Sequence, residues 1–152
     1  MKYADTIEYA SQVRWDKATG GIIEYDNYDD SSFDTPTEFD GKGSAPCPDQ
    51  LFLASIGGCL MNTFTHYGKR LDLTFDDVYI SLHASLSLHR EGYRFDCIKA
   101  KIRIQAPEEY TELAERCGKL AKNYCHITRS IESAIPVDVD IEVDSKSLCI
   151  YP

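Results

Sequence analysis

Two cysteines stand out in this sequence because their surroundings could make them reactive. Cys59 follows two adjacent glycines in the apolar segment SIGGCL, residues 55–60. Each glycine inside a helix costs about 1 kcal/mol relative to alanine, so the pair indicates either a notch for close helix packing or room for a reaction partner. Cys125 opens a short predicted helix, and a helix N-terminus lowers the pKa of a thiol. Because the thiolate is the nucleophilic form of cysteine, thiol redox chemistry is the first hypothesis.

The other four cysteines fit structural roles better. Cys117 falls on the apolar stripe of a predicted helix, Cys97 alternates with the apolar residues of a predicted strand, and Cys47 and Cys149 lie in a loop and near the C-terminus. Free cysteine behaves as a small hydrophobic residue in such places. No two cysteines form a CxxC pair, and the spacing of all six indicates neither a disulfide framework nor a zinc site.

Two histidines near the thiols leave an alternative open. His66 lies seven residues after Cys59, on the same side of a predicted helix, and His126 adjoins Cys125. These four residues could be drawn as a metal site, but no close pair has the spacing of metal ligands. A surface or hydrogen-bonded role is therefore the favoured interpretation for both histidines.

Length, charge and hydropathy restrict the class of protein. The 152 residues suit one domain, spanning 1–152, with a sizeable core. The formal net charge of −9 argues against nucleic acid and against anionic membrane surfaces as partners. No apolar run reaches the length of about 18 residues that a membrane span needs, and the N-terminal MKYADTIEYA lacks the apolar core of a signal peptide. We therefore expect a cytoplasmic protein, in which cysteines stay mostly reduced.

The periodicity of apolar residues predicts the elements that would position the thiols. Strands are predicted over 7–15, 22–25, 79–88, 95–104 and 137–143, with a turn at 19–21 and an irregular connection over 26–48. Helices are predicted from Pro48 to about Arg70, from Pro107 to about Tyr124, and over 125–135. The first helix is apolar nearly all round and is predicted to be buried on most sides. This order of elements predicts an α+β protein with helices packed on antiparallel sheet.

Two motifs around the thiols resemble the signatures of the OsmC/Ohr family, the osmotically inducible and organic hydroperoxide resistance proteins. In PCPDQLFLASIGGCL, residues 46–60, Asp49 follows a proline and precedes Cys59 by ten residues. In YCHITRSI, residues 124–131, a cysteine opens a short helix and is followed by a branched, a hydroxyl and a basic residue. The FDG sequence at 39–41, the closing IPVDVDIEV and the order of elements also match. The resemblance covers almost the whole chain.

The resemblance implies an OsmC-like fold built as an intertwined homodimer, with a central buried helix from each subunit. It also implies an antioxidant, stress-response activity, the reduction of organic hydroperoxides. On this pattern Cys59 is the peroxidatic thiolate, which becomes a sulfenic acid, and Cys125 is the resolving thiol, which condenses with it to a disulfide. A dithiol then restores both thiols, and in the Ohr branch this is dihydrolipoamide on a protein. No metal, flavin or haem is required as a cofactor.

The sequence departs from the family pattern mainly in that it lacks the arginine that activates the peroxidatic thiol. Cys59 lies mid-helix and cannot use the dipole of its own helix, so it needs a cation to favour the thiolate. In the Ohr branch an arginine follows Gly-Gly, where this chain has Ile22. In the OsmC branch it precedes Phe-x-Gly, where this chain has Glu38. The acid that steers the arginine is also shorter here, Asp49 rather than glutamate.

Four other cations stay open as the activator of the thiol. Arg129, which follows Cys125, and Arg14, the only arginine ahead of Cys59, are the leading candidates, and Arg70 and Lys42 are the others. The absent family arginine also motivates a second function on the same scaffold, a redox-sensing or small-molecule-binding protein with little peroxidase turnover. A catalytically idle dimer is a third interpretation.

Overall fold

The computed structural model consists of two units. A 23-residue helix, α1 (Pro48–Arg70), begins in the first unit and continues into the second. The structure describes residues 5–145. The first unit extends to Phe52 and the second begins at Leu53. The prediction of a single domain over 1–152 stays a prediction.

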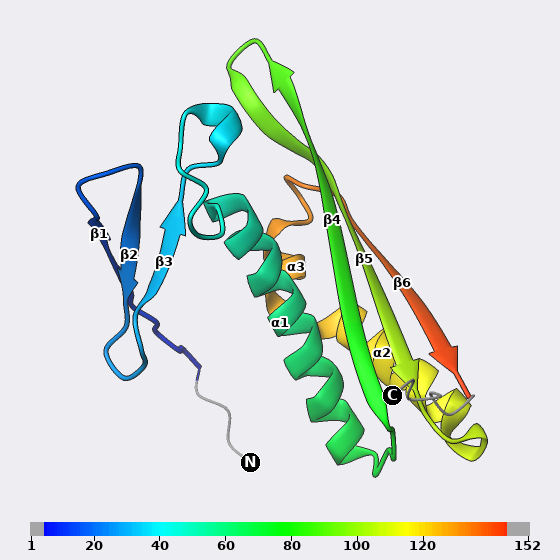
Figure 1. Cartoon of the computed structure of the whole chain (residues 1–152). Coiled ribbons are helices and arrows are strands. Elements are labelled where there is room, and N and C mark those ends of the chain that lie inside the picture. The colour runs from blue at the N-terminus through cyan, green and yellow to red at the C-terminus, as the bar shows by residue number, and fades with distance from the viewer. Residues whose placement is uncertain (1–4, 146–152) are drawn as a thin grey trace, which may run out of the picture. The chain divides into compact units, whose positions relative to one another are not determined.

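The first unit is an antiparallel three-stranded sheet in the order β1 (Gln12–Trp15), β2 (Gly20–Glu24) and β3 (Ser31–Asp34), shown in blue and cyan in Figure 1. A Cβ atom on Gly20 would lie 2.1 Å from the carbonyl oxygen of Phe33, so only glycine lets β2 and β3 approach this closely. A short 3-10 helix, η1 (Thr37–Phe39), follows β3.

A buried carboxylate organises the segment that leads into α1. Asp34 accepts hydrogen bonds from the hydroxyl of Thr19 at 2.6 Å, from the backbone N–H of Thr35 at 2.8 Å, and from the N–H and hydroxyl of Ser44 at 2.9 and 2.6 Å. These bonds hold the pKa of Asp34 well below its usual range, with the Ser44 hydroxyl contributing most. The carboxylate therefore links β3 to both the β1–β2 turn and the loop before α1.

Large apolar side chains of the first unit are exposed in the single chain. They include Ile7, Tyr9, Val13, Trp15, Tyr25 and Tyr28. No residue of β1 is buried. A set of this kind is typical of a surface that meets another protein chain.

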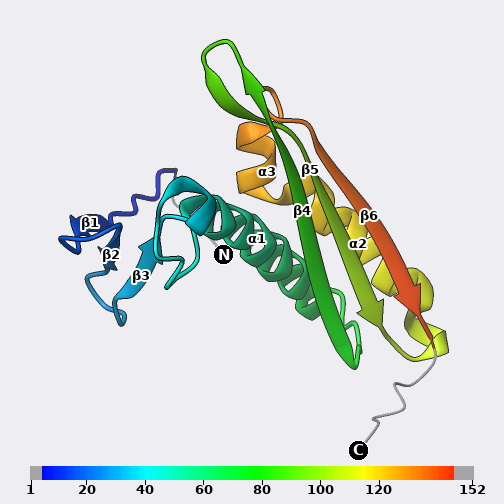
Figure 2. The ribbon, with the colours of Figure 1, turned by 45° about the horizontal axis from the view of Figure 1, so that its top comes forward.

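The second unit is built on three long strands. β4 (Asp77–His89) and β5 (Gly92–Gln105) form an antiparallel hairpin with an irregularity at Ser85/Leu86, and β6 (Val137–Asp144) pairs parallel to β5. The connection from β5 to β6 contains the 3-10 helix η2 (Glu108–Tyr110) and the helices α2 (Thr111–Tyr124) and α3 (His126–Ile131). Figures 1 and 2 show α2 behind these strands, with α3 to one side of β4 in both views.

The two faces of this sheet differ in polarity. On the inner face, a Cβ on Gly57 of α1 would lie 2.8 Å from Leu82 of β4, and one on Gly118 of α2 would lie 2.8 Å from Ile141 of β6. Both helices therefore pack closely on the same apolar face. The outer face carries ion pairs, among them Lys101 with Glu142 at 2.9 Å.

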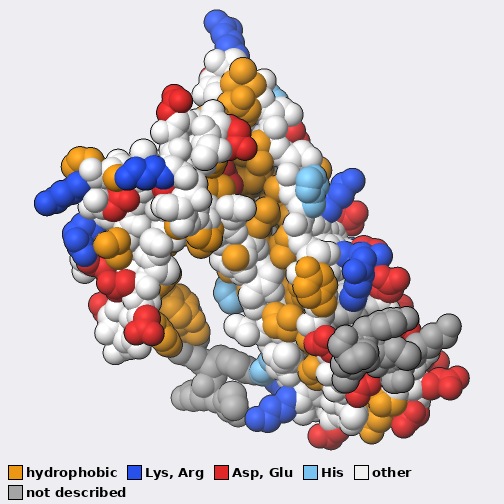
Figure 3. Space-filling view, in the orientation of Figure 1, with side chains coloured by type: hydrophobic (Ala, Val, Ile, Leu, Met, Phe, Trp, Pro, Cys, Tyr) orange, Lys and Arg blue, Asp and Glu red, His pale blue; other side chains and the backbone are white. Residues whose placement is uncertain are grey.

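The core of the second unit lies between this sheet and the helices. Its fully buried large side chains are Ile56, Leu60, Phe64, Ile98, Ile102 and Ile104. The rings of Phe64 and Phe75 meet edge to face with centroids 5.3 Å apart. Exposed apolar side chains remain near the outer end of the β4–β5 hairpin, where Leu88 is 69% and Tyr93 57% exposed (Figure 3).

Most predicted elements are confirmed, and the α+β class is confirmed. The helix beginning at Pro48, the β4–β5 hairpin, the two helices after Pro107 and the closing strand lie where the patterns placed them. The prediction that α1 is buried on most sides is only partly met, because one of its faces is exposed in the single chain; its exposed residues include Ala54, Ser55, Gly58, Asn62 and Thr65.

Three predictions about the strands are wrong in detail. The first strand spans only β1, and the turn lies at residues 16–19, before the two glycines, which belong to β2. The connection over 26–48 contains β3 and η1. The sheet of the second unit is mixed, because the β5–β6 crossover brings β6 back parallel to β5.

Candidate active site

Helix α1 carries Cys59 on its buried face. Ile56 and Leu60, one turn before it and next to it, are 0% exposed, and Cys59 itself is 7% exposed. The hydroxyl of Thr63 donates a hydrogen bond to the Cys59 carbonyl oxygen at 2.7 Å. The thiol therefore projects from a well-packed helix into the second unit.

Cys125 forms the one-residue joint between α2 and α3. Its extended backbone, with φ −62° and ψ 111°, ends the first helix and starts the second. Its N–H donates to the Ala121 carbonyl oxygen at 3.0 Å, and its own carbonyl accepts from the Arg129 N–H and the Thr128 hydroxyl, both at 3.1 Å. Cys125 is 0% exposed, so this joint is held firmly in the core.

The structure brings the two predicted thiols together. The side chain of Cys125 interacts with that of Cys59, and the backbone N–H groups of Ile127 and His126 also act on the Cys59 sulfur. Burial, first, and then the interaction with Cys125 raise the pKa of Cys59, while the two N–H groups oppose that rise. The site is therefore a buried dithiol at the start of α3.

A histidine ring completes the contacts of the Cys59 sulfur. The sulfur lies 3.5 Å from Nδ1 and 3.8 Å from Nε2 of His126. Sequence reasoning left His126 out of the site, although its position beside Cys125 was the available signal. The direction in which its ring points depends on the bend at Cys125, which the spacing of residues does not reveal.

Of the other predicted site residues, Arg129 lies in the second unit with the thiols, whereas Arg14 and Asp49 belong to the first unit. Arg129 of α3 is exposed and lines a cavity of about 440 Å³ together with Lys122, Tyr124 and Glu132, and neither cysteine lines this cavity. Arg14 belongs to β1, where its guanidinium pairs with Glu24 at 2.9 Å.

Asp49, the predicted steering acid, is exposed in the first turn of α1, within the first unit. Lys42 is also exposed in the first unit, and its backbone N–H donates to the Thr19 hydroxyl at 3.3 Å. Arg70 lies exposed in the last turn of α1. The prediction for Cys149 falls outside the described residues.

An aromatic contact connects α1 to the end of α2, beside the dithiol. The rings of Tyr67 and Tyr124 lie 5.6 Å apart between centroids, and His66 meets Tyr67 edge to face at 5.3 Å. His66 thus packs on a tyrosine, two turns along α1 from Cys59.

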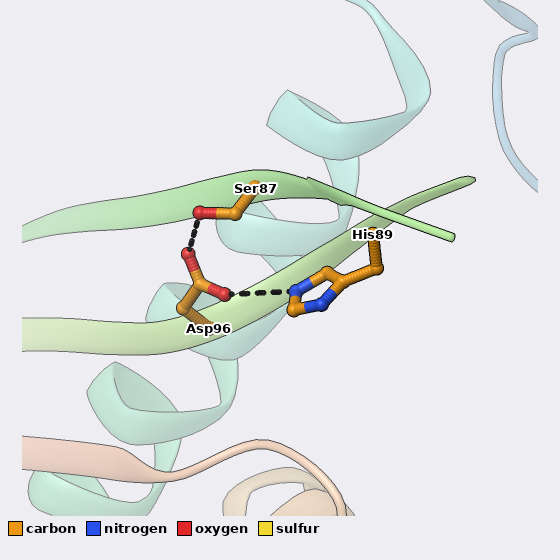
Figure 4. A network of polar contacts seen from close by, with 3 residues as sticks. All are labelled: Ser87, His89 and Asp96. Carbon is orange, nitrogen blue, oxygen red and sulfur yellow. Dashed lines mark hydrogen bonds and ion pairs between the residues drawn. The ribbon is translucent and has the colours of Figure 1, made fainter. Parts of the chain in front are cut away.

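A serine, an aspartate and a histidine on the β4–β5 hairpin form a second polar cluster, shown in Figure 4. The Ser87 hydroxyl donates to Asp96 at 2.5 Å, and Nε2 of His89 lies 3.4 Å from the other carboxylate oxygen. A nucleophilic triad needs the histidine in the middle, in contact with the serine. Here the carboxylate is in the middle, so the cluster joins two strands and is no hydrolytic site.

Over residues 5–145, no group of three or more His, Cys, Asp or Glu side chains is arranged to hold a metal ion. Within the same range, no helix combines the length and the apolar character needed to cross a lipid bilayer.

Comparisons with known proteins identify the family of this chain and agree with its fold. The family model of OsmC-like proteins matches residues 41–140. The chain belongs to this family. An uncharacterized protein of Acinetobacter baylyi, ACIAD3023, is 25% identical over 85% of this chain and 92% of its own. The uncharacterized YmaD of Bacillus subtilis is 23% identical over 81% of this chain and 84% of its own.

Solved structures share the fold at low sequence identity. An organic hydroperoxide resistance protein OsmC from Legionella pneumophila superposes with a TM-score of 0.65 at 22% identity, covering 91% of this chain and 99% of its own. An OsmC-like protein from Mycoplasma pneumoniae superposes with a TM-score of 0.75 at 15% identity, covering 93% and 98%. A putative organic hydroperoxide resistance protein from Vibrio cholerae, with captopril in one active site, gives 0.66 at 16%, covering 96% and 99%.

Proposed function

We propose that this protein is a thiol-dependent peroxidase that reduces organic hydroperoxides, with Cys59 as the peroxidatic and Cys125 as the resolving cysteine. The observation that carries the proposal is that these two buried thiols, 66 positions apart in the sequence, lie close enough to interact. Membership of the OsmC-like family supports the same chemistry.

Each step of this reaction has a residue to perform it. The Cys59 thiolate attacks the peroxide, a sulfur–oxygen bond forms, the O–O bond breaks, and an alcohol leaves. The thiol of Cys125 then attacks the Cys59 sulfenic acid, forming the disulfide and releasing water. A dithiol reductant, for which protein-bound dihydrolipoamide is the candidate, exchanges with the disulfide and restores both thiols.

Exposure supports this assignment of roles. Cys59 is 7% exposed and Cys125 is 0% exposed, so a substrate entering from solvent meets Cys59 first. Cys117, also 0% exposed, lies on the face of α2 that packs against the sheet and has a pKa raised by burial. It is an inert thiol of the same core and serves as a matched control.

The reaction is tested by treating the reduced protein with cumene hydroperoxide and mapping disulfides by mass spectrometry. We expect a Cys59–Cys125 link, turnover with a dithiol, and loss of both in Cys59→Ser. Cys117→Ala should behave as the wild type. Absence of the link together with absence of turnover would rule the peroxidase out.

The raised pKa of Cys59 favours a second candidate, a redox sensor or small-molecule-binding protein on the same fold. A thiol that stays protonated reacts slowly with peroxide. In that case the Cys59–Cys125 disulfide forms once with excess hydroperoxide, while dithiol-dependent turnover stays negligible. The ratio of single oxidation to steady turnover separates the two candidates.

We propose further that the protein works as a homodimer in the cytoplasm, where thiols are kept reduced. Support comes from the exposed apolar side chains of the first unit, including Tyr9 at 89% and Trp15 at 66%, and from the exposed face of α1 around Gly58. A Cβ on Gly58 would meet nothing within 4 Å in the single chain, so this face has room for a close neighbour. Sedimentation over a range of concentrations tests this, and a stable monomer would contradict it.

A further inference from the structure

In the family pattern an arginine activates the peroxidatic thiol, and this chain has no arginine at either family position. The group that takes the proton of Cys59 must therefore be another one. The positions that hold the activating arginine in the two branches are Ile22 and Glu38. Arg14 pairs with Glu24, and Arg129 lines a cavity that neither cysteine lines. The contacts of Cys59 itself must therefore indicate how the thiolate is made.

The nearest ionisable ring to the Cys59 sulfur belongs to His126. Nδ1 lies at 3.5 Å and Nε2 at 3.8 Å, both within hydrogen-bonding reach of sulfur. Because a neutral imidazole has one protonated nitrogen and one that accepts, either tautomer presents an acceptor to the thiol. The contact therefore tolerates a change in which nitrogen carries the proton.

The His126 side chain also connects a buried group with solvent. Cys59 is buried, whereas His126 is exposed at the first position of α3. A proton taken from the thiol by this ring can pass to water, which the buried sulfur reaches poorly. The other titratable groups at this point are Cys125, which contacts Cys59, and Arg129, three residues further along α3.

We propose that His126 is the general base and general acid of the peroxidase site, forming a thiolate–imidazolium pair with Cys59 in place of the family arginine. This inference rests on the proposed function for its second half, the reaction with peroxide. Its first half, the activation of the thiol, holds without any peroxide.

In this mechanism one proton moves from Cys59 to His126 and then to the leaving group. The ring nitrogen of His126 accepts the Cys59 proton, which leaves a thiolate beside an imidazolium. The thiolate attacks one peroxide oxygen, the sulfur is oxidised by two electrons, and the O–O bond breaks. The departing alkoxide takes the proton from the imidazolium and leaves as an alcohol, which returns His126 to its neutral form.

The backbone and the ring of His126 can be separated by mutation. The backbone N–H of His126 also acts on the Cys59 sulfur, and it remains in any non-proline variant. His126→Asn thus removes the titratable ring at an exposed position and leaves the backbone N–H in place. His126→Gln provides a second variant, and His83→Asn, at an exposed position of β4, provides a matched control.

The experiment measures the rate of Cys59 alkylation by iodoacetamide between pH 5 and 10, with peptide mass spectrometry to separate Cys59 from the other cysteines. We expect His126→Asn and His126→Gln to lower the rate at pH 7 at least tenfold and to move the titration of Cys59 to higher pH. His83→Asn should match the wild type. Identical profiles for the wild type and both His126 variants would overturn the proposal.

A parallel measurement with cumene hydroperoxide keeps this proposal distinct from the proposed function. General acid–base catalysis typically contributes about 10²–10⁴-fold, so oxidation of Cys59 should slow about 100-fold in His126→Asn. If the alkylation profile depends on His126 but no variant turns over peroxide, the peroxidase is refuted and the thiol–histidine pair is supported. If the wild type turns over peroxide and His126→Asn does so equally fast, the histidine has no catalytic role.

Discussion

Removal of the resolving thiol should stop the reaction at its first product. In Cys125→Ala the Cys59 sulfenic acid loses its neighbouring thiol, because the side chains that contact the Cys59 sulfur are those of Cys125 and His126. The matched variant is Cys117→Ala, which also removes a fully buried sulfur, from the middle of α2. The two variants therefore differ in chemistry and resemble each other in packing.

The expected cost in stability follows from the burial of both residues. Loss of one buried sulfur compares with loss of about one methylene group, about 0.8 kcal/mol, and the cavity left behind adds to this. We expect about 1–2 kcal/mol for each variant. With a urea m-value of about 2 kcal/mol/M, this lowers the unfolding midpoint by about 0.5–1 M.

Cys125→Ala and Cys117→Ala should differ in their reaction with hydroperoxide, although we expect similar losses of stability. After one equivalent of cumene hydroperoxide, a dimedone-type reagent should label Cys59 in Cys125→Ala and leave it nearly unlabelled in Cys117→Ala. The Cys59 titration should also move to lower pH in Cys125→Ala, because the interaction with Cys125 raises its pKa in the wild type. A disulfide from Cys59 to another cysteine in Cys125→Ala, or equal labelling of both variants, would refute the reasoning.

Three further predictions concern residues outside the dithiol. Asp34→Asn should reduce the acid sensitivity of folding. The depressed pKa of Asp34 contributes stability that is complete above about pH 4 and is lost as the pH falls toward the pKa of Asp34 in the folded protein. The urea midpoints at pH 3 and pH 6 should therefore differ less in the variant than in the wild type. Phe64→Ala should cost about 3–5 kcal/mol, since the ring is fully buried and packs on Phe75, and urea unfolding measures this loss. Ser87→Ala should raise the pKa of Asp96 toward its usual value, because the serine hydroxyl is the main cause of its lowering, and NMR titration of the carboxyl reads this out.

Predictions from the sequence succeeded where buried and exposed positions alternate regularly, because apolar and polar residues then alternate in the sequence as well. In β5, Ile98, Ala100 and Ile102 are buried while Lys99 is exposed, and this alternation is visible in the sequence. In the first unit the apolar alternation over 7–15 extends beyond β1, which is exposed throughout, and β3 lies in an acidic segment where no alternation predicted a strand. β3 is held by pairing with β2 and by the hydrogen bonds of Asp34, which depend on residues distant in the chain.

The direction of β6 and the contact of His126 with Cys59 are two features that the sequence patterns do not predict. Alternation within 137–143 predicts a strand, but its parallel pairing is set by the long crossover through α2 and α3. The two thiols could be paired in advance because their motifs resemble a known family. The His126 ring reaches Cys59 only because the chain bends at Cys125, and that bend is a property of the fold.

The single-residue joint at Cys125 makes the length of α2 part of the site. This helix has 14 residues and ends immediately before Cys125. One inserted residue would turn the joint by about 100° and advance it by about 1.5 Å, and would carry Cys125, His126 and Ile127 away from the Cys59 sulfur together. Evolution can therefore alter the outer surface of α2 freely, while insertions and deletions within it would dismantle the thiol centre in one step.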